Sequence, residues 1–213
     1  MNRRGVLMAA ASLTGAGLLG PQMAMAAPNS GGPTVIVELI TFLCPRSRSV
    51  NEHIQRLTLE AESVGTILRC APVAWIGQSL WPDRFYYAMR DLYPHTEHIV
   101  REVLFDGLQR DGLKFEELTQ VMAYMERRQV FKVVADKIPD FNLVTLADKA
   151  GSDDPLFAEY KATRLIDASG ATEMPVFMWI VDGEIKKKIS PQDAKEPMAL
   201  VSLVSQAINR AAS

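Results

Sequence analysis

Long apolar runs mark two strands near the start of the chain. Residues 34–43 (TVIVELITFL) are rich in apolar and β-branched side chains apart from Glu38, a pattern that predicts a strand buried on both faces. Residues 66–76 form a second such run. Between the two, apolar residues recur at intervals of three and four, which predicts one helix with a buried face from Pro45 to Gly65: Val50, Ile54, Leu57, Ala61 and Val64. A strand, a helix and a strand in this order predict a right-handed parallel crossover.

Helical spacing dominates from residue 81 to residue 168, with helices predicted over residues 82–94, near residues 115–125 and from residue 153. Two β-rich runs follow, over residues 176–181 and 184–189, and the Asp182-Gly183 pair between them predicts a type I′ hairpin. Pro197 opens a last helix. The chain therefore belongs to the α/β class, with a mixed sheet in the order βαβ…ββα, helices on both faces and a helical insertion in the middle.

These patterns predict four parts of the chain. We expect a cleaved export signal over residues 1–26 and a flexible leader over residues 27–33. One sheet domain is expected from residues 34–80 and 169–213 together, and an inserted helical subdomain from residues 81–168.

The first 26 residues have the pattern of an export signal. A positive start (Asn2-Arg3-Arg4) precedes an uncharged apolar stretch over residues 6–19, and Ala24-Met25-Ala26 supplies the small residues of a cleavage site. The stretch is too short to be a spanning helix. The paired arginines fit a twin-arginine signal, and a general secretory signal explains them equally well. Either route predicts a periplasmic protein.

Composition and charge exclude several other classes. Of 213 residues, 48% are hydrophobic and 23% are charged, which excludes a disordered chain. The net charge of −2, or −4 once Arg3 and Arg4 are removed with the signal, argues against nucleic-acid binding. Two cysteines exclude a disulfide scaffold and a four-cysteine zinc site. We expect no metal, no cofactor and no stable insertion into a membrane.

Cys44 stands where the first predicted strand meets the first predicted helix. Pro45 suits the first helical position, where its missing N–H leaves no hydrogen bond unmade. The free N–H groups and the dipole at a helix N-terminus favour the thiolate, which is the reactive form of cysteine. Arg46 and Arg48 add positive charge in the first turn. We predict a reactive Cys44; the alternative is a small buried hydrophobic residue.

Residues 38–45 (ELITFLCP) resemble the active-site strand and Cys-Pro helix start of the DsbA branch of thioredoxin-fold proteins, including an acidic residue six positions before the cysteine. Met174-Pro175 resembles the family's cis-proline loop, which lies beside the active cysteine and binds the partner peptide. The helical insertion fits the same family. The resemblance covers about residues 35–212. It implies a thioredoxin-like fold and disulfide exchange, with Pro45, Met174 and Pro175 at the peptide-binding surface.

Ser47 is the departure from that family. The family pattern is Cys-Pro-x-Cys, and the chain has Cys44-Pro45-Arg46-Ser47. A second thiol would resolve a mixed disulfide, which a serine cannot do. The resemblance therefore implies single-thiol exchange, with Cys44 as nucleophile and Arg46 stabilising the thiolate. Ser47 either donates a hydrogen bond to the Cys44 sulfur or helps to satisfy the first helical turn.

Two further residues carry open questions. The resemblance implies that Glu38 is a buried proton relay beneath Cys44; the alternatives are a glutamate that reaches solvent or pairs with an internal arginine. Cys70 lies in the neighbouring parallel strand, about five residues out of level with Cys44, or roughly 16 Å. A disulfide requires Cα atoms within about 7 Å. We predict that Cys70 is buried and inert and that no internal disulfide forms.

Two functions follow from these features. The first is an exported DsbA-like protein that exchanges disulfides through Cys44 with protein thiols or glutathione. The alternative is a redox-inert structural or chaperone-like accessory subunit, bound in fixed stoichiometry to an exported partner protein. A glutathione-dependent transferase or isomerase on a related fold ranks below both, because such proteins usually lack a Cys-Pro pair and an export signal.

Two further sequence features each have two interpretations. The aromatic-rich stretch either lines a peptide groove or packs in the core of the insertion: Leu80, Trp81, Phe85, Tyr86 and Tyr87. His95 and His98 have the spacing of half a metal site, and we expect ordinary helix polarity there.

Overall fold

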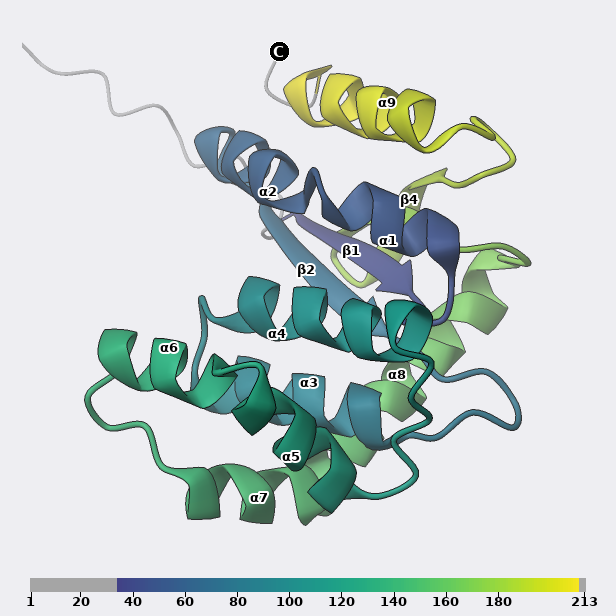
Figure 1. The fold of residues 1–213 in the computed structure, drawn as a ribbon. Helices are drawn as coiled ribbons and strands as arrows, with labels where there is room; N and C mark the ends of the chain where they lie inside the picture. The colour runs from purple at the N-terminus through teal and green to yellow at the C-terminus, as the bar shows by residue number, and fades with distance from the viewer. Residues whose placement is uncertain (1–33, 211–213) are drawn as a thin grey trace, which may run out of the picture. The chain divides into compact units, whose positions relative to one another are not determined.

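The computed structural model describes residues 34–210 (Figure 1). The predicted export signal (residues 1–26) and leader (residues 27–33) lie outside the described residues. In chain order the elements are β1 (Val35–Ile40), α1 (Pro45–Asn51), α2 (Ile54–Ser63), β2 (Ile67–Pro72), α3 (Trp81–Leu92), α4 (Glu97–Phe105), the π-helix η1 (Asp106–Arg110), α5 (Leu118–Arg127), α6 (Val130–Lys137), α7 (Leu143–Gly151), α8 (Asp153–Ser169), β3 (Val176–Val181), β4 (Glu184–Ile189) and α9 (Pro197–Arg210). Within this range, no helix combines the length and the apolar character needed to cross a bilayer.

The described strands form a mixed sheet in the order β2-β1-β3-β4. Strand β1 is parallel to β2 and antiparallel to β3, and β3 is antiparallel to β4. The turn between β3 and β4 has positive φ at both central residues, 52° at Asp182 and 79° at Gly183, as a type I′ turn requires. The parallel crossover and the hairpin are therefore both confirmed.

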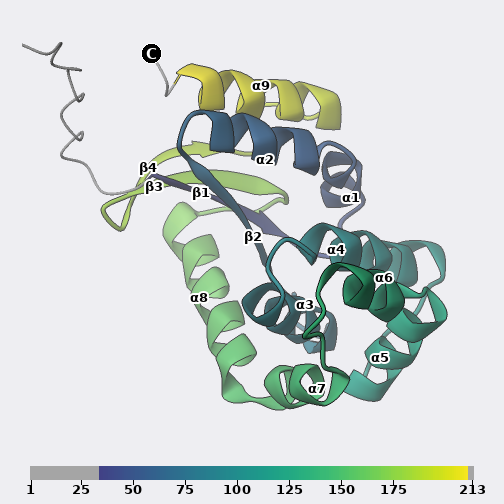
Figure 2. The same ribbon diagram turned by 90° about the vertical axis from the view of Figure 1, so that its left-hand side faces the viewer.

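Helices cover the two faces of this sheet. Side chains alternate along β1, so that Ile36 packs on one face and Leu39 on the other. The Ile36 face is covered by α1, α2 and α9, and the Leu39 face by α8. Figure 2 shows α2 and α9 on one side of the strands and α8 on the opposite side. The predicted layering is confirmed.

The local structure around Cys44 differs from the sequence-based prediction. Strand β1 ends at Ile40, because residues 41–44 form a turn in which the Cys44 N–H donates to the Thr41 oxygen at 3.0 Å. The single helix predicted after it is two helices, α1 and α2. The break follows from a tighter turn, in which the His53 N–H donates to the Val50 oxygen at 2.9 Å. The apolar spacing continues across the break, so both helices bury the same face.

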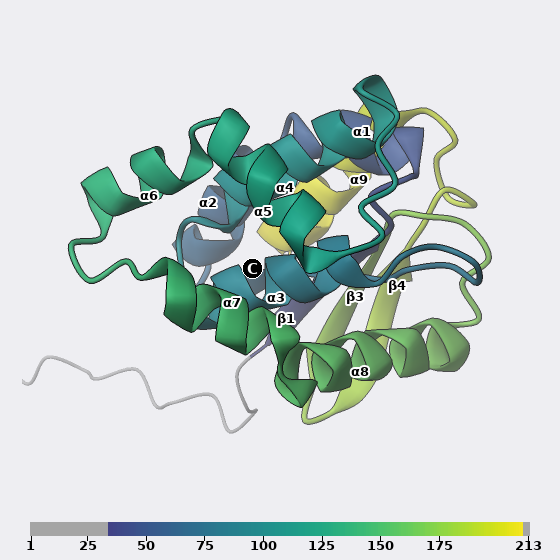
Figure 3. The same ribbon diagram turned by 60° about the horizontal axis from the view of Figure 1, so that its bottom comes forward.

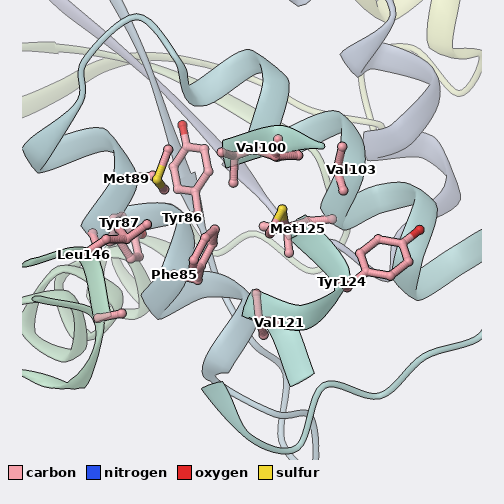
Figure 4. Packing of buried hydrophobic residues seen from close by; sticks show 14 of the residues in the cluster. Phe85, Tyr86, Tyr87, Met89, Val100, Val103, Val121, Tyr124, Met125 and Leu146 are labelled. Atoms are coloured by element: carbon pink, nitrogen blue, oxygen red, sulfur yellow. The ribbon is translucent and has the colours of Figure 1, made fainter. Parts of the chain in front are cut away.

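Helices α3 to α7 gather beside the sheet (Figure 3), and their buried side chains form a core that continues to Ile40 of β1 and Cys70 of β2. Phe85, Tyr86 and Tyr87 are buried there, so the core-packing interpretation holds for these three residues. Figure 4 shows Phe85 and Tyr86 from α3 packed with Met125 from α5. Helix α8, which the sequence assigns to the insertion, packs both against α3 and α7 and against the sheet.

Candidate functional site

Cys44 lies at the start of α1, beside the loop that precedes β3. It is the N-cap residue of α1, and Pro45 occupies the first turn, as predicted. The thiol is half-buried, and its Sγ donates to the main-chain oxygen of Met174 at 3.4 Å. The Met174-Pro175 peptide bond is cis. The structure thus brings Cys44 and Pro45 to the Met174-Pro175 loop, although Met174 is 130 residues from Cys44 in the chain.

Arg46 links the first turn of α1 to the same loop. Its Nη1 donates to Glu173 Oε2 at 2.8 Å. The two side chains are 29% and 53% exposed, so the pair contributes about 0–1 kcal/mol to stability. Arg46 thus pairs with the Glu173 carboxylate, and its role in stabilising the Cys44 thiolate stays a prediction.

Ser47 is fully buried in the first turn of α1. Its Oγ has no hydrogen-bond partner among the described residues, so neither of the two bonds considered for it is formed. On a helix, side chains three positions apart lie about 5–6 Å from each other. The hydroxyl is therefore close to Cys44, and it is not engaged by any other described group.

Glu38 is held by an arginine inside the protein. Both of its carboxylate oxygens accept from Arg101 of α4, at 2.6 and 2.8 Å. The side chains are 0% and 3% exposed. Burial alone would lower the pKa of Arg101, but the charge and the hydrogen bonds of the Glu38 carboxylate raise it, so that Arg101 stays charged. The internal arginine, one of our alternatives, is present, and a relay role for Glu38 remains a prediction.

Cys70 pairs with Glu38 in the parallel register of β1 and β2, which places it six residues behind the level of Cys44. Both cysteines are free, and Cys70 is buried, as predicted. Burial raises the pKa of the Cys70 thiol to about 12, an effect that the charge of Arg101 opposes. Cys70 therefore carries almost no thiolate at neutral pH.

We expect thiol labelling of the native reduced protein to modify Cys44 and to spare Cys70. The reason is that the thiolate is the reacting species and that Cys70 is shielded. Mass spectrometry after a short alkylation should show one adduct on the native protein and two after unfolding in urea. A protein with no free thiol and no intermolecular disulfide would contradict the assignment.

A groove opens beside the turn that carries Cys44. It has a volume of about 800 Å³ and reaches Leu43, the residue before the cysteine. Leu80 and Trp81 of the aromatic-rich stretch line it, and peptide binding there stays a prediction. Leu43, Trp75 and Ile76 are exposed apolar residues near it in the chain.

Several residues of this site were not predicted from the spacing or the composition of the sequence. Gln109 of η1 donates to the main-chain oxygens of Phe42 and Cys44, and Asp106 of η1 accepts from Arg48 at 2.8 Å. Glu173 and Arg101 were also missed as partners of Arg46 and Glu38. The sequence offers no signal for these pairs, because each joins segments more than 50 residues apart.

A metal centre is not assembled within residues 34–210, where no three His, Cys, Asp or Glu side chains cluster closely enough to hold an ion. His98 belongs to α4, whereas His95 lies in the turn before it with a φ of 73°.

The fold and the placement of these residues define a class. A mixed sheet, a helical insertion between β2 and β3, and a cysteine at the start of the first helix opposite a cis-proline make up a thioredoxin-like fold of the DsbA type. The predicted fold class is thus confirmed.

Comparison with solved structures leads to the same class. The chain resembles the DsbA of Pseudomonas aeruginosa (TM-score 0.59, 15% identity, 88% of each chain covered). It also resembles the oxidoreductase DsbA1 of Neisseria meningitidis (TM-score 0.58, 15% identity, 87% of this chain and 88% of the other). A third is the cytosolic disulfide reductase DsbM of P. aeruginosa (TM-score 0.59, 11% identity, 82% of this chain and 98% of the other). At these identities the likeness establishes the fold. No family model and no curated protein matches the sequence.

Proposed function

We propose that the protein is an exported, DsbA-like thiol–disulfide exchange protein that acts through Cys44 alone. One observation carries the proposal. The half-buried Cys44 sulfur stands at the start of α1, hydrogen-bonded to the residue before a cis-proline, while a serine occupies the position of a resolving thiol. The oxidoreductase neighbours support the chemistry, and the pattern of residues 1–26 supports export to the periplasm.

The proposed reaction takes place in two exchanges. Cys44 first loses its S–H proton to solvent, and the thiolate attacks one sulfur of a partner disulfide. A new bond joins Cys44 to that sulfur, the partner S–S bond breaks, and the second partner sulfur leaves as a thiolate. Because Ser47 cannot attack this mixed disulfide, a thiol from outside the chain must do so, which regenerates Cys44 and forms a new external disulfide.

The partners that we propose are thiols and disulfides of exported proteins, or glutathione. A protein partner can use the groove beside Leu43, which offers apolar surface next to the sulfur. Pro45 is exposed beside Cys44, and the main chain at Met174 contacts the sulfur, so an extended segment of the partner would lie along Pro45 and this loop. Glutathione needs access to the sulfur alone.

We expect the reduced protein to form one mixed disulfide when it is mixed with oxidised glutathione or with a peptide disulfide. Mass spectrometry should show a single adduct that dithiothreitol removes. Cys70→Ala, the matched control, should form the same adduct, and Cys44→Ala should form none. An adduct that persists in Cys44→Ala, or a wild-type protein that remains unmodified, would sink the proposal.

A second candidate function is a redox-inert accessory subunit or chaperone-like protein of an exported complex. The serine at position 47 and the exposed apolar residues beside the groove favour it, since binding there requires no thiol. The experiment that separates the two functions is partner capture with Cys44→Ala. Full binding and full function of that variant would favour the accessory subunit over the exchange protein.

A further inference from the structure

Gln109 connects the helical subdomain to the turn that carries Cys44. Its side-chain Nε2 donates to the main-chain oxygen of Phe42 at 2.7 Å and to that of Cys44 at 3.1 Å. One amide group thus uses both of its hydrogens on two carbonyl groups that lie on either side of Leu43. These partners are 67 and 65 residues away along the chain.

The π-helix η1 sets the direction of the Gln109 side chain. A π-turn adds one residue to a helical turn, and such turns are frequent at functional sites. Gly107 lets η1 pack closely on the ring of Phe115, because a Cβ at this position would lie 2.7 Å from that ring. Asp106 fixes the start of η1, since its carboxylate accepts from Arg48 of α1 and from Arg128, each at 2.8 Å. Gln109 therefore projects from a turn that the Asp106 carboxylate anchors to Arg48 of α1 and to Arg128.

Other contacts hold the turn as well. The Cys44 N–H donates to the Thr41 oxygen at 3.0 Å, and the Leu43 N–H donates to Thr41 Oγ1 at 3.4 Å. The buried ring of Phe42 packs on Tyr86 of α3 and Phe105 of α4, which are apolar contacts and provide no partner for the carbonyl groups of the turn. Among the described residues, Gln109 supplies the donors that reach this turn from the helical subdomain.

We propose that Gln109 is a positioning residue for disulfide exchange at Cys44. Its amide holds the turn so that Sγ faces the oxygen of Met174, and its N–H groups offset the negative charge of the Cys44 carbonyl while charge develops on the sulfur. The inference rests on the proposed exchange function. It adds a residue that the sequence patterns around Cys44 and Pro175 do not include.

The test compares Gln109→Glu and Gln109→Ala with the wild-type protein. Glutamate has nearly the same shape as glutamine, but when ionised it is an acceptor only and faces two carbonyl oxygens. Gln120 provides the matched control, because its Oε1 accepts from the Glu116 N–H at 2.7 Å, a bond that glutamate can also make. The rate of mixed-disulfide formation is measured with hydroxyethyl disulfide, a neutral probe that does not respond to long-range charge.

We expect exchange by Gln109→Glu to be about tenfold slower than in the wild type, with Gln109→Ala in between. Gln120→Glu should exchange at the wild-type rate. The deficit of Gln109→Glu relative to Gln109→Ala should shrink as the pH falls toward the carboxyl pKa of ~4.3, because a protonated carboxyl regains an O–H donor. A merely structural role would not give this pH dependence.

When both Gln109 variants fold, three outcomes would overturn the inference. The first is wild-type exchange rates in both Gln109 variants. The second is an equal loss of exchange rate in both variants that does not change with pH. Urea unfolding shows whether such a loss of rate follows from a loss of stability. The third is a wild-type protein that forms no mixed disulfide, which overturns the proposed function and this inference together. If Gln109→Glu does not fold, the test compares Gln109→Ala with Gln120→Ala. Equal exchange rates of these two variants would overturn the inference.

Discussion

Replacing Ser47 by cysteine is expected to give the protein an internal disulfide with Cys44. Side chains three positions apart on a regular helix have Cβ atoms about 5–6 Å apart, and a disulfide needs about 3.5–4.5 Å. Cys44 is the N-cap of α1 and has extended backbone angles, so we expect a small adjustment there to bring the two sulfurs into bonding distance. The Ser47 hydroxyl has no partner among the described residues, so a thiol in its place breaks no hydrogen bond. After mild oxidation the variant should lose two thiols without forming a dimer. Under the same conditions Cys44 and Cys70 of the wild type should each remain a thiol or form a mixed disulfide, with no bond between them.

The oxidised Ser47→Cys variant should then oxidise a reduced dithiol peptide in stoichiometric amount. Its disulfide passes to the peptide, and both of its own cysteines end as thiols. Ser49→Cys is the control, because Ser49 is five positions from Cys44 and faces another direction on α1. That variant should keep reactive thiols under the same conditions. Retention of all thiols by oxidised Ser47→Cys would show that the start of α1 does not bring the two positions together.

The sequence was most informative where local chemistry determines the structure. The Asp182-Gly183 turn has the positive φ values that its residue types favour, and the boundaries of β3 and β4 match the two β-rich runs. Met174-Pro175 was identified through the resemblance to the cis-proline loop of the DsbA branch, and the bond is cis beside Cys44. In the hairpin, by contrast, a short stretch of sequence contains the groups that set the conformation.

Features that depend on distant segments could not be predicted in this way. Apolar spacing continues through residues 50–64, so it did not reveal the break at His53, which depends on one hydrogen bond to Val50. The reach of Gln109 to the Cys44 turn depends on η1, and a π-turn has no marker in the sequence pattern. Glu38 was placed in a buried strand correctly, but its partner Arg101 lies 63 residues away.

The second large effect is expected from Glu38→Gln. This change leaves the Arg101 guanidinium charged and buried without its carboxylate, and breaking a buried ion pair in this way costs about 3–5 kcal/mol. For a domain of this size, each 1 kcal/mol lowers the Tm by roughly 2–4 °C. Urea and thermal unfolding measure the loss. Glu173→Gln, which breaks the exposed pair with Arg46, is the matched control and should cost about 1 kcal/mol or less.

The double variant Glu38→Gln with Arg101→Met separates stability from chemistry. It removes the unpaired charge, so most of the lost stability should return. If Glu38 relays protons to Cys44, a refolded double variant should still exchange disulfides about a hundredfold more slowly than the wild type. If Glu38 serves only to pair with Arg101, the rate should match the wild type. Recovery of both stability and rate would therefore reject the relay, and a Glu38→Gln variant as stable as the wild type would contradict the buried ion pair itself.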